Sequence, residues 1–121
     1  MRRAATTLAA ALLATAGPAG AAELPFPQPL EAEIAAAKQN MVTDQTEALR
    51  HVARAELLAG RIRDARERAI AVATLRWLGA EAHLRSDASD RAAPLLDDGL
   101  RRIAAISGPL KVRGDLLMAQ G

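Results

Sequence analysis

The long interval without proline between Pro29 and Pro94 is the feature that most restricts how this chain can fold. Proline ends or kinks helices, and the interval that it leaves open is dominated by alanine, leucine, arginine and glutamate, which are strong helix formers. Runs of β-branched residues are almost absent from it. The sequence therefore predicts an all-α fold made of several helices.

The first residues have the three-part pattern of a secretory signal peptide. A basic start at residues 1–3 precedes an uncharged run of small and apolar residues over 4–16, and Gly17-Pro18 then breaks any helix. Small residues before Glu23 are what a signal peptidase needs, and the apolar run is shorter than the about 20 residues that cross a bilayer. We therefore expect a signal peptide over 1–22 and a soluble periplasmic or secreted product; the alternative is a disordered alanine-rich tail.

Signal cleavage changes the charge of the chain. The whole sequence has 16 Lys and Arg against 14 Asp and Glu, and two of those arginines, Arg2 and Arg3, lie in the expected signal peptide. The mature chain would therefore be balanced, which disfavours nucleic-acid binding because such binding needs a positive excess. The chain has no cysteine, which excludes disulfides, thiolate metal sites and lipid attachment.

Helix-capping residues, glycines and apolar spacing divide the rest of the chain. Alternating prolines predict an extended leader over residues 23–29. A helical domain over residues 30–121 is predicted to follow. Its first helix covers 30–38, its second runs from a cap at Thr43 or Asp44 to Gly60, and its third covers 61–85. After a turn at 86–89, in which Asp87 or Ser89 caps the next helix, a fourth helix covers 91–106 and a fifth begins at about Lys111.

Apolar spacing also predicts which faces of these helices are buried. The second half of the 61–85 helix is apolar on two sides, and its Trp77 is expected in the core, with an exposed aromatic platform as the alternative. Acid-before-base pairs mark the solvated faces: Asp64–Arg68, Asp97–Arg101 and Asp98–Arg102. The remaining predicted buried positions include Leu49, Val52, Ala53 and Leu57, then Ala92, Leu96, Gly99 and Ile103, then Val112, Leu116 and Leu117.

The segment from Arg61 to Gly121 resembles the tetratricopeptide repeat, a pair of antiparallel helices with small residues at the close contacts. Ala80 falls at the usual glycine of the first helix, with Gly79 as an alternative. The other matching positions are His83, Ala92, Leu96 and Gly99. The resemblance implies a tetratricopeptide-like fragment of an α-solenoid, in which Leu84 faces Leu96 and Gly99 lies close to the small residues near Ala80.

The amino-acid sequence of this segment is also similar to the N-terminal periplasmic part of one type of exported bacterial protein. In those proteins a tetratricopeptide array precedes a membrane segment and a diguanylate cyclase domain. The last helix, beginning near Lys111, resembles the opening of another repeat. We therefore expect that the helical domain is incomplete at its C-terminus. The last helix then either lacks a neighbour or folds back onto the 91–106 helix and caps it.

Residues that could carry catalysis or hold a ligand are few. The three serines, Ser86, Ser89 and Ser107, fall in predicted turns, where serine usually caps a helix. His51 and His83 are isolated from the three or four converging ligands that zinc needs. The arginines between 61 and 68 alternate with acids and indicate a solvated face. We therefore expect no catalytic, cofactor-binding or metal-binding residue, no cofactor and no enzyme activity.

The expected function is that of an exported helical-repeat protein whose concave face binds a protein or peptide. One alternative is a sensory N-terminal fragment of a membrane-bound signalling protein such as a diguanylate cyclase, and another is a small exported helical bundle of unknown role. An exported enzyme would need converging polar groups that the sequence does not supply, and a membrane-surface helix would need a basic face opposite bulky aromatics. Self-association through an exposed edge is a further expectation.

Overall fold

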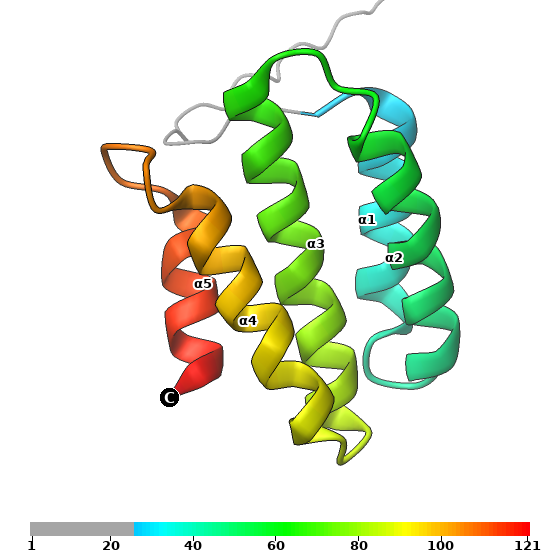
Figure 1. Cartoon of the computed structure of the whole chain (residues 1–121). Coiled ribbons are helices and arrows are strands. Elements are labelled where there is room, and N and C mark those ends of the chain that lie inside the picture. Colours follow the sequence, from blue (N-terminus) through cyan, green and yellow to red (C-terminus); the bar gives the residue numbers. More distant parts are fainter. Residues whose placement is uncertain (1–25) are drawn as a thin grey trace, which may run out of the picture.

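The computed structural model describes residues 26–121, so the predicted signal peptide and the start of the predicted leader lie outside the described residues. Every regular element in the described part is a helix, which confirms the all-α prediction (Figure 1). The helices are α1 (Gln28–Asn40), α2 (Gln45–Ala59), α3 (Ala65–Arg85), α4 (Ser89–Ile103) and α5 (Lys111–Gln120).

Consecutive helices run in opposite directions and lie side by side (Figure 1). Helices α1 and α2 form one antiparallel hairpin, and α3 and α4 form a second. Helix α3 lies at the centre, because it packs against α2 on one side and α4 on the other, while α5 contacts both α3 and α4.

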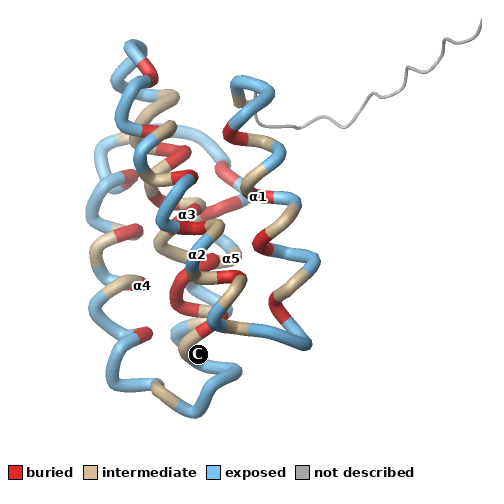
Figure 2. The backbone as a smooth tube through the Cα atoms, turned by 90° about the vertical axis from the view of Figure 1, so that its right-hand side faces the viewer, coloured by how far each residue is buried: buried red, intermediate tan, exposed pale blue. Residues whose placement is uncertain are grey.

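Two hydrophobic cores meet on α3. The first fills the space between α1, α2 and one side of α3, and the second lies between the opposite side of α3, α4 and α5. The buried positions follow the inward sides of the helices (Figure 2). This confirms the prediction that the second half of α3 is buried on two sides. The largest fully buried side chains are Leu30, Leu75, Leu78, Ile103 and Leu116.

The starts of α2 and α3 have the same cap. Asp44 accepts a hydrogen bond from the backbone N–H of Glu47 at 3.0 Å, so Asp44 rather than Thr43 is the N-cap of α2. Asp64 accepts from the N–H of Glu67 at 2.7 Å in the same way. The predicted helix start at residue 61 is therefore wrong, because this second cap delays α3 to residue 65.

The predicted Asp64–Arg68 ion pair does not form, because Arg68 points to the loop instead. Its guanidinium donates to the carbonyl oxygens of Ile62 at 2.6 Å and Arg63 at 3.2 Å. These bonds satisfy carbonyl groups of the loop between α2 and α3 and hold it against the first turn of α3. Arg61, Arg63 and Arg66 are exposed, as the solvated-face interpretation predicted.

Other predicted boundaries shift by two or three residues. Helix α1 begins at Gln28 because Pro29 is accommodated in its first turn, where a missing N–H costs little. Helix α4 begins two residues earlier than predicted and ends three earlier. Its N-cap is Ala88 without a side-chain hydrogen bond, so the predicted capping by Asp87 or Ser89 is wrong. Asp87 instead adopts a positive φ of 63°, which reverses the chain.

The buried face of α2 differs from the predicted one. Leu57 is 71% exposed, and Ala53 is exposed as well. The buried face is formed by residues at steps of three and four, namely Ala48, Val52, Ala55 and Ala59. Val52 is buried as predicted, and Leu49 is partly buried against the same core, so only Ala53 and Leu57 of the predicted face turn to the solvent.

Candidate functional site

The two histidines do not form a metal site. Within residues 26–121, no three or more His, Cys, Asp or Glu side chains are placed to hold a metal ion. His51 Nδ1 lies 2.7 Å from Glu33 Oε1 on α1, and His51 Nε2 lies 3.5 Å from Glu47 Oε2 on α2. The predicted proximity of Glu47 is confirmed. Glu33 was not predicted, because only the packing of α1 on α2 brings it near.

Arg76 links the two hairpins across α3. Its guanidinium pairs with Glu56 of α2 on one side, and its Nε lies 2.8 Å from Asp98 Oδ2 of α4 on the other. Asp98 also accepts from Arg102 at 2.7 Å, and the hydrogen bonds from Arg102 and Arg76 lower the pKa of Asp98 from 3.8 to about 2. The predicted Asp98–Arg102 pair is confirmed. Arg101 pairs with Asp98 rather than with the predicted Asp97.

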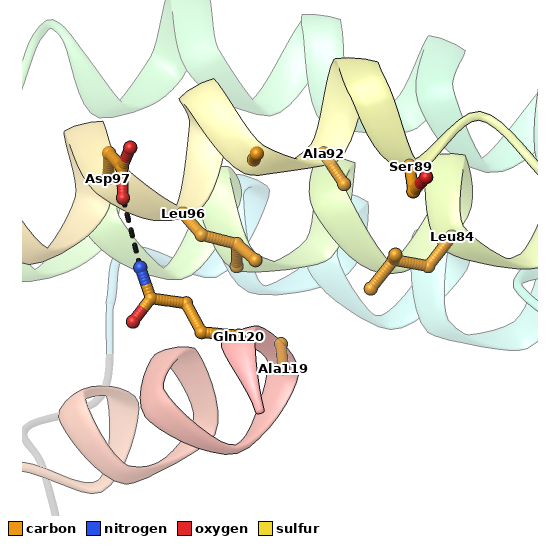
Figure 3. Close-up of a pocket in the computed structure, with 8 residues that line it drawn as sticks. Leu84, Ser89, Ala92, Leu96, Asp97, Ala119 and Gln120 are labelled. Carbon is orange, nitrogen blue, oxygen red and sulfur yellow. Dashed lines mark hydrogen bonds between the residues drawn. The ribbon is translucent and has the colours of Figure 1, made fainter.

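An apolar hollow lies at the end of α5, between that helix and the α3–α4 hairpin (Figure 3). Its volume of about 470 Å³ lies within the range of ligand-binding clefts. Gln120 donates a hydrogen bond to Asp97 at its edge, 2.9 Å from Nε2 to Oδ1. The lining consists mainly of aliphatic side chains, with few polar groups: Leu84, Ser89, Ala92, Ala93, Leu96, Asp97, Ala119 and Gln120. We refer to this hollow as the α4–α5 hollow.

Exposed apolar side chains lie in the lining of the α4–α5 hollow and in the last turns of α5. Leu84 in its lining is 37% exposed, and on α5 Leu117 is 53% and Met118 is 83% exposed. The prediction that Leu117 belongs to the buried side of the last helix is therefore wrong, whereas Leu116 is fully buried against α3 and α4. Single exposed leucines are ordinary, but apolar side chains that border an apolar hollow are typical of a binding surface.

A smaller cleft lies on the other side of α5, next to Trp77. It has a volume of about 230 Å³ and is lined by Trp77, Glu81, Asp115, Met118 and Ala119. Trp77 packs against both hydrophobic cores but is only partly buried, so the prediction that it belongs to the core holds for only part of the ring. We refer to this space as the Trp77 cleft.

A cation of the protein itself already lies beside the Trp77 cleft. Lys111 Nζ is 5.7 Å from the centroid of the Trp77 ring and 2.9 Å from Asp115 Oδ2. An ammonium group within about 6 Å of an indole face is attracted by the electrons of the ring. The same helix therefore contributes both a carboxylate of the cleft and its nearest cation.

Ser86 and Gly99 take structural positions, whereas Ser89 lines the α4–α5 hollow. Ser86 Oγ donates to the carbonyl oxygen of Ala82 at 2.8 Å at the end of α3, and Ser107 is exposed. Leu84 and Leu96 both line the α4–α5 hollow, as their predicted opposition requires. Gly99 lies against Leu116 of α5 and against Arg76, which is one turn before Ala80 on α3.

Comparison with known proteins identifies no relative. No family model matches the chain, and no curated protein or solved structure is significantly similar to it. No helix among the described residues is both long enough and apolar enough to cross a membrane. The α4–α5 hollow and the Trp77 cleft are therefore the features of residues 26–121 that indicate a function.

Proposed function

We propose that this chain is an exported, non-catalytic helical-repeat protein that binds an amphipathic helical segment of a partner protein in the α4–α5 hollow. The observation that carries the proposal is that the hollow continues the surface on which α5 itself is bound. The same two helices, α3 and α4, form the floor under α5 and the floor of the hollow.

The packing of α5 indicates what the hollow would accept. Helix α5 places Val112 and Leu116, one turn apart, against the α3–α4 hairpin, and both are buried. Beyond the last turn of α5 the floor continues through Leu96, Ala92 and Leu84 (Figure 3). An amphipathic helix with aliphatic residues three and four positions apart is complementary to such a groove.

The arrangement of the helices supports the repeat part of the proposal. Two hairpins follow one another, and a fifth helix packs on the second hairpin, which is the order expected for successive tetratricopeptide-like units. The pattern of residues 1–22 supports export. The structural role of Ser86 and the absence of a metal cluster among residues 26–121 give no support to a catalytic role.

Selection of random 16-residue peptides on the purified chain tests the proposal, with an Ala93→Glu variant as a parallel target. Ala93 is exposed and lines the hollow, so glutamate places a carboxylate there without disturbing either core. Ala53→Glu, at an exposed position in the middle of α2, is the matched control. We expect enriched peptides to have apolar residues at steps of three and four.

The affinity of those peptides, measured by calorimetry, should fall at least about tenfold for Ala93→Glu, because an unpaired carboxylate would be desolvated on binding. Ala53→Glu should bind as the unaltered chain does. Failure to enrich such peptides, or equal binding to Ala93→Glu, would contradict the proposal.

A further inference from the structure

We infer that the Trp77 cleft receives the cationic end of a lysine or arginine side chain from the partner segment. The inference rests on the proposed function and adds a chemical requirement to the partner. It arises from an aromatic ring and two carboxylates that face one small cleft beside the α4–α5 hollow.

The cleft is assembled from matching turns of two helices. Trp77 and Glu81 lie one turn apart on α3, and Asp115 and Met118 lie about one turn apart on α5. Helices α3 and α5 run in the same direction and pack together (Figure 1). The four side chains therefore line a common space. Its volume of about 230 Å³ is below the about 300–1,000 Å³ of small-molecule pockets. The cleft is therefore of a size for a single side chain.

The chemistry of the lining selects a cation. The face of an indole ring attracts ammonium and guanidinium groups, and carboxylates beside it add Coulomb attraction. Met118 contributes a polarizable thioether that adapts to the stem of a long side chain. Lys111 gives an example within the protein, since its ammonium group lies near the Trp77 ring and is bonded to Asp115.

The cations already present do not close the cleft to a ligand. Lys111 and Asp115 form an i,i+4 pair in which the lysine side chain is 73% exposed, and Arg85 approaches Glu81 only to 3.6 Å. Exposed pairs of this kind contribute little stability, so a partner's cation can join or replace them. Lys111 would then weaken binding of an incoming cation by repulsion.

The cleft and the hollow lie on opposite sides of the end of α5 and share one lining residue, Ala119. A segment in the hollow can therefore place a long basic side chain past Ala119 and into the cleft. The charged side chains in the two linings are all carboxylates, namely Asp97, Glu81 and Asp115. A segment with aliphatic residues for the hollow and a basic residue for the cleft is therefore complementary in both shape and charge.

Two matched sets of synthetic 16-residue helical peptides test the inference. Both carry leucine and alanine on one face and glutamine on the other. In one set a single lysine replaces each glutamine in turn, and in the other norleucine does so. Trp77 is the only tryptophan of the chain and there is no tyrosine, so its fluorescence reports directly on the cleft. Calorimetry gives the affinities on the full chain.

We expect at least one lysine peptide to bind about three- to tenfold more tightly than its norleucine counterpart at low salt and to change the Trp77 fluorescence. The preference should disappear in a Glu81→Gln, Asp115→Asn double variant and at high salt, where surface charges are screened. It should persist in Glu67→Gln, which removes a charge near the opposite end of α3. Lys111→Met, which keeps the apolar stem, should increase it.

The possible failures are distinguishable. If both sets bind equally, the inference is wrong and the proposed function stands. If the lysine preference survives in the double variant with its fold intact by circular dichroism, the cation binds elsewhere and the inference is again wrong. If neither synthetic set binds at concentrations at which the selected peptides bind, the inference is wrong and the proposed function stands. If neither the synthetic nor the selected peptides bind, the inference and the proposed function are both wrong.

Discussion

Replacing Gly99 with alanine tests whether α5 packs directly on the α3–α4 hairpin. An ideal Cβ at Gly99 would lie 2.9 Å and 3.2 Å from the two terminal methyl carbons of Leu116 and 3.3 Å from Arg76 Cβ. Leu116 is fully buried, so its methyl groups cannot move into solvent, and the Cβ of Arg76 is fixed to its backbone. A methyl group at position 99 must therefore push α5 outward or force Leu116 from its rotamer.

Two effects of opposite sign set the magnitude. Alanine stabilises a helix interior by about 1 kcal/mol relative to glycine, whereas overpacking costs about 1–3 kcal/mol. We expect Gly99→Ala to lower the free energy of unfolding by up to about 2 kcal/mol. Gly99→Leu should lower it further despite the better helix propensity. Gly114→Ala is the matched control on α5, because nothing lies within 4 Å of its Cβ position. It should raise the free energy of unfolding by about 0.5–1 kcal/mol.

Urea unfolding followed by circular dichroism measures both variants on the same scale. The expected difference between Gly99→Ala and Gly114→Ala is about 1–3 kcal/mol. Adding Leu116→Val to Gly99→Ala should cost less than Leu116→Val costs alone, because the smaller side chain makes room for the added methyl group. If Gly99→Ala stabilised the chain as much as Gly114→Ala does, the close contact between α4 and α5 would be refuted.

Three further outcomes are expected. Because the pKa of Asp98 is lowered to about 2, its ionised form should stabilise the fold at pH values above about 4. This contribution of about 1–2 kcal/mol should be lost as the pH falls towards 2. Asp98→Asn should flatten the dependence of the unfolding free energy on pH over that range, and parallel curves for the variant and the original chain would contradict this. Trp77→Ala should cost about 2–3 kcal/mol in urea unfolding, below the about 3–5 kcal/mol of a fully buried aromatic, because the ring is partly exposed; no measurable loss would mean that it does not join the two cores. The intact mass of the exported product should correspond to a chain that begins at or near Glu23, and a mass that includes residues 1–22 would contradict export.

Capping residues in the sequence indicate where helices begin. Asp44 and Glu47 placed the start of α2, and the same spacing at Asp64 and Glu67 held the information for α3. The arginines around Asp64 favour helix by propensity and predict a start at residue 61, whereas the cap formed by Asp64 begins α3 at residue 65. Exposed Leu57 shows a different limit. Burial on α2 depends on where α1 and α3 pack against it, and the apolar character of one side chain does not determine that.

The candidate site depends on contacts that no local pattern contains. Trp77 and Glu81 come from α3, whereas Asp115 and Met118 come from α5, and only the return of α5 alongside α3 brings them together. The same reason applies to Glu33, which reaches His51 through the packing of α1 on α2. The sequence identified Trp77 as a residue of interest but not its neighbours.

The two faces of α5 should have separable roles, and deletion and surface substitution distinguish them. On the inner face Val112 and Leu116 are buried, and Arg113 donates to the carbonyl oxygens of Ile103 and Ile106 at 3.1 Å and 2.8 Å. Deleting residues 111–121 should therefore remove at least about 3–5 kcal/mol, since full burial of each aliphatic side chain contributes about 1.5–3 kcal/mol, and unfolding should lose cooperativity.

On the outer face, replacing both exposed residues, Leu117→Gln with Met118→Gln, should leave the free energy of unfolding within about 0.5 kcal/mol of its original value. The same double variant should weaken the binding of the peptides selected on the α4–α5 hollow, because it removes exposed apolar surface from the last turn of α5, whose Ala119 and Gln120 line the hollow. A truncated chain that unfolds with unchanged free energy would show that α5 is not an integral part of the second core. A double variant as unstable as the deletion would show that the outer face is structural as well, leaving no free apolar edge for a partner.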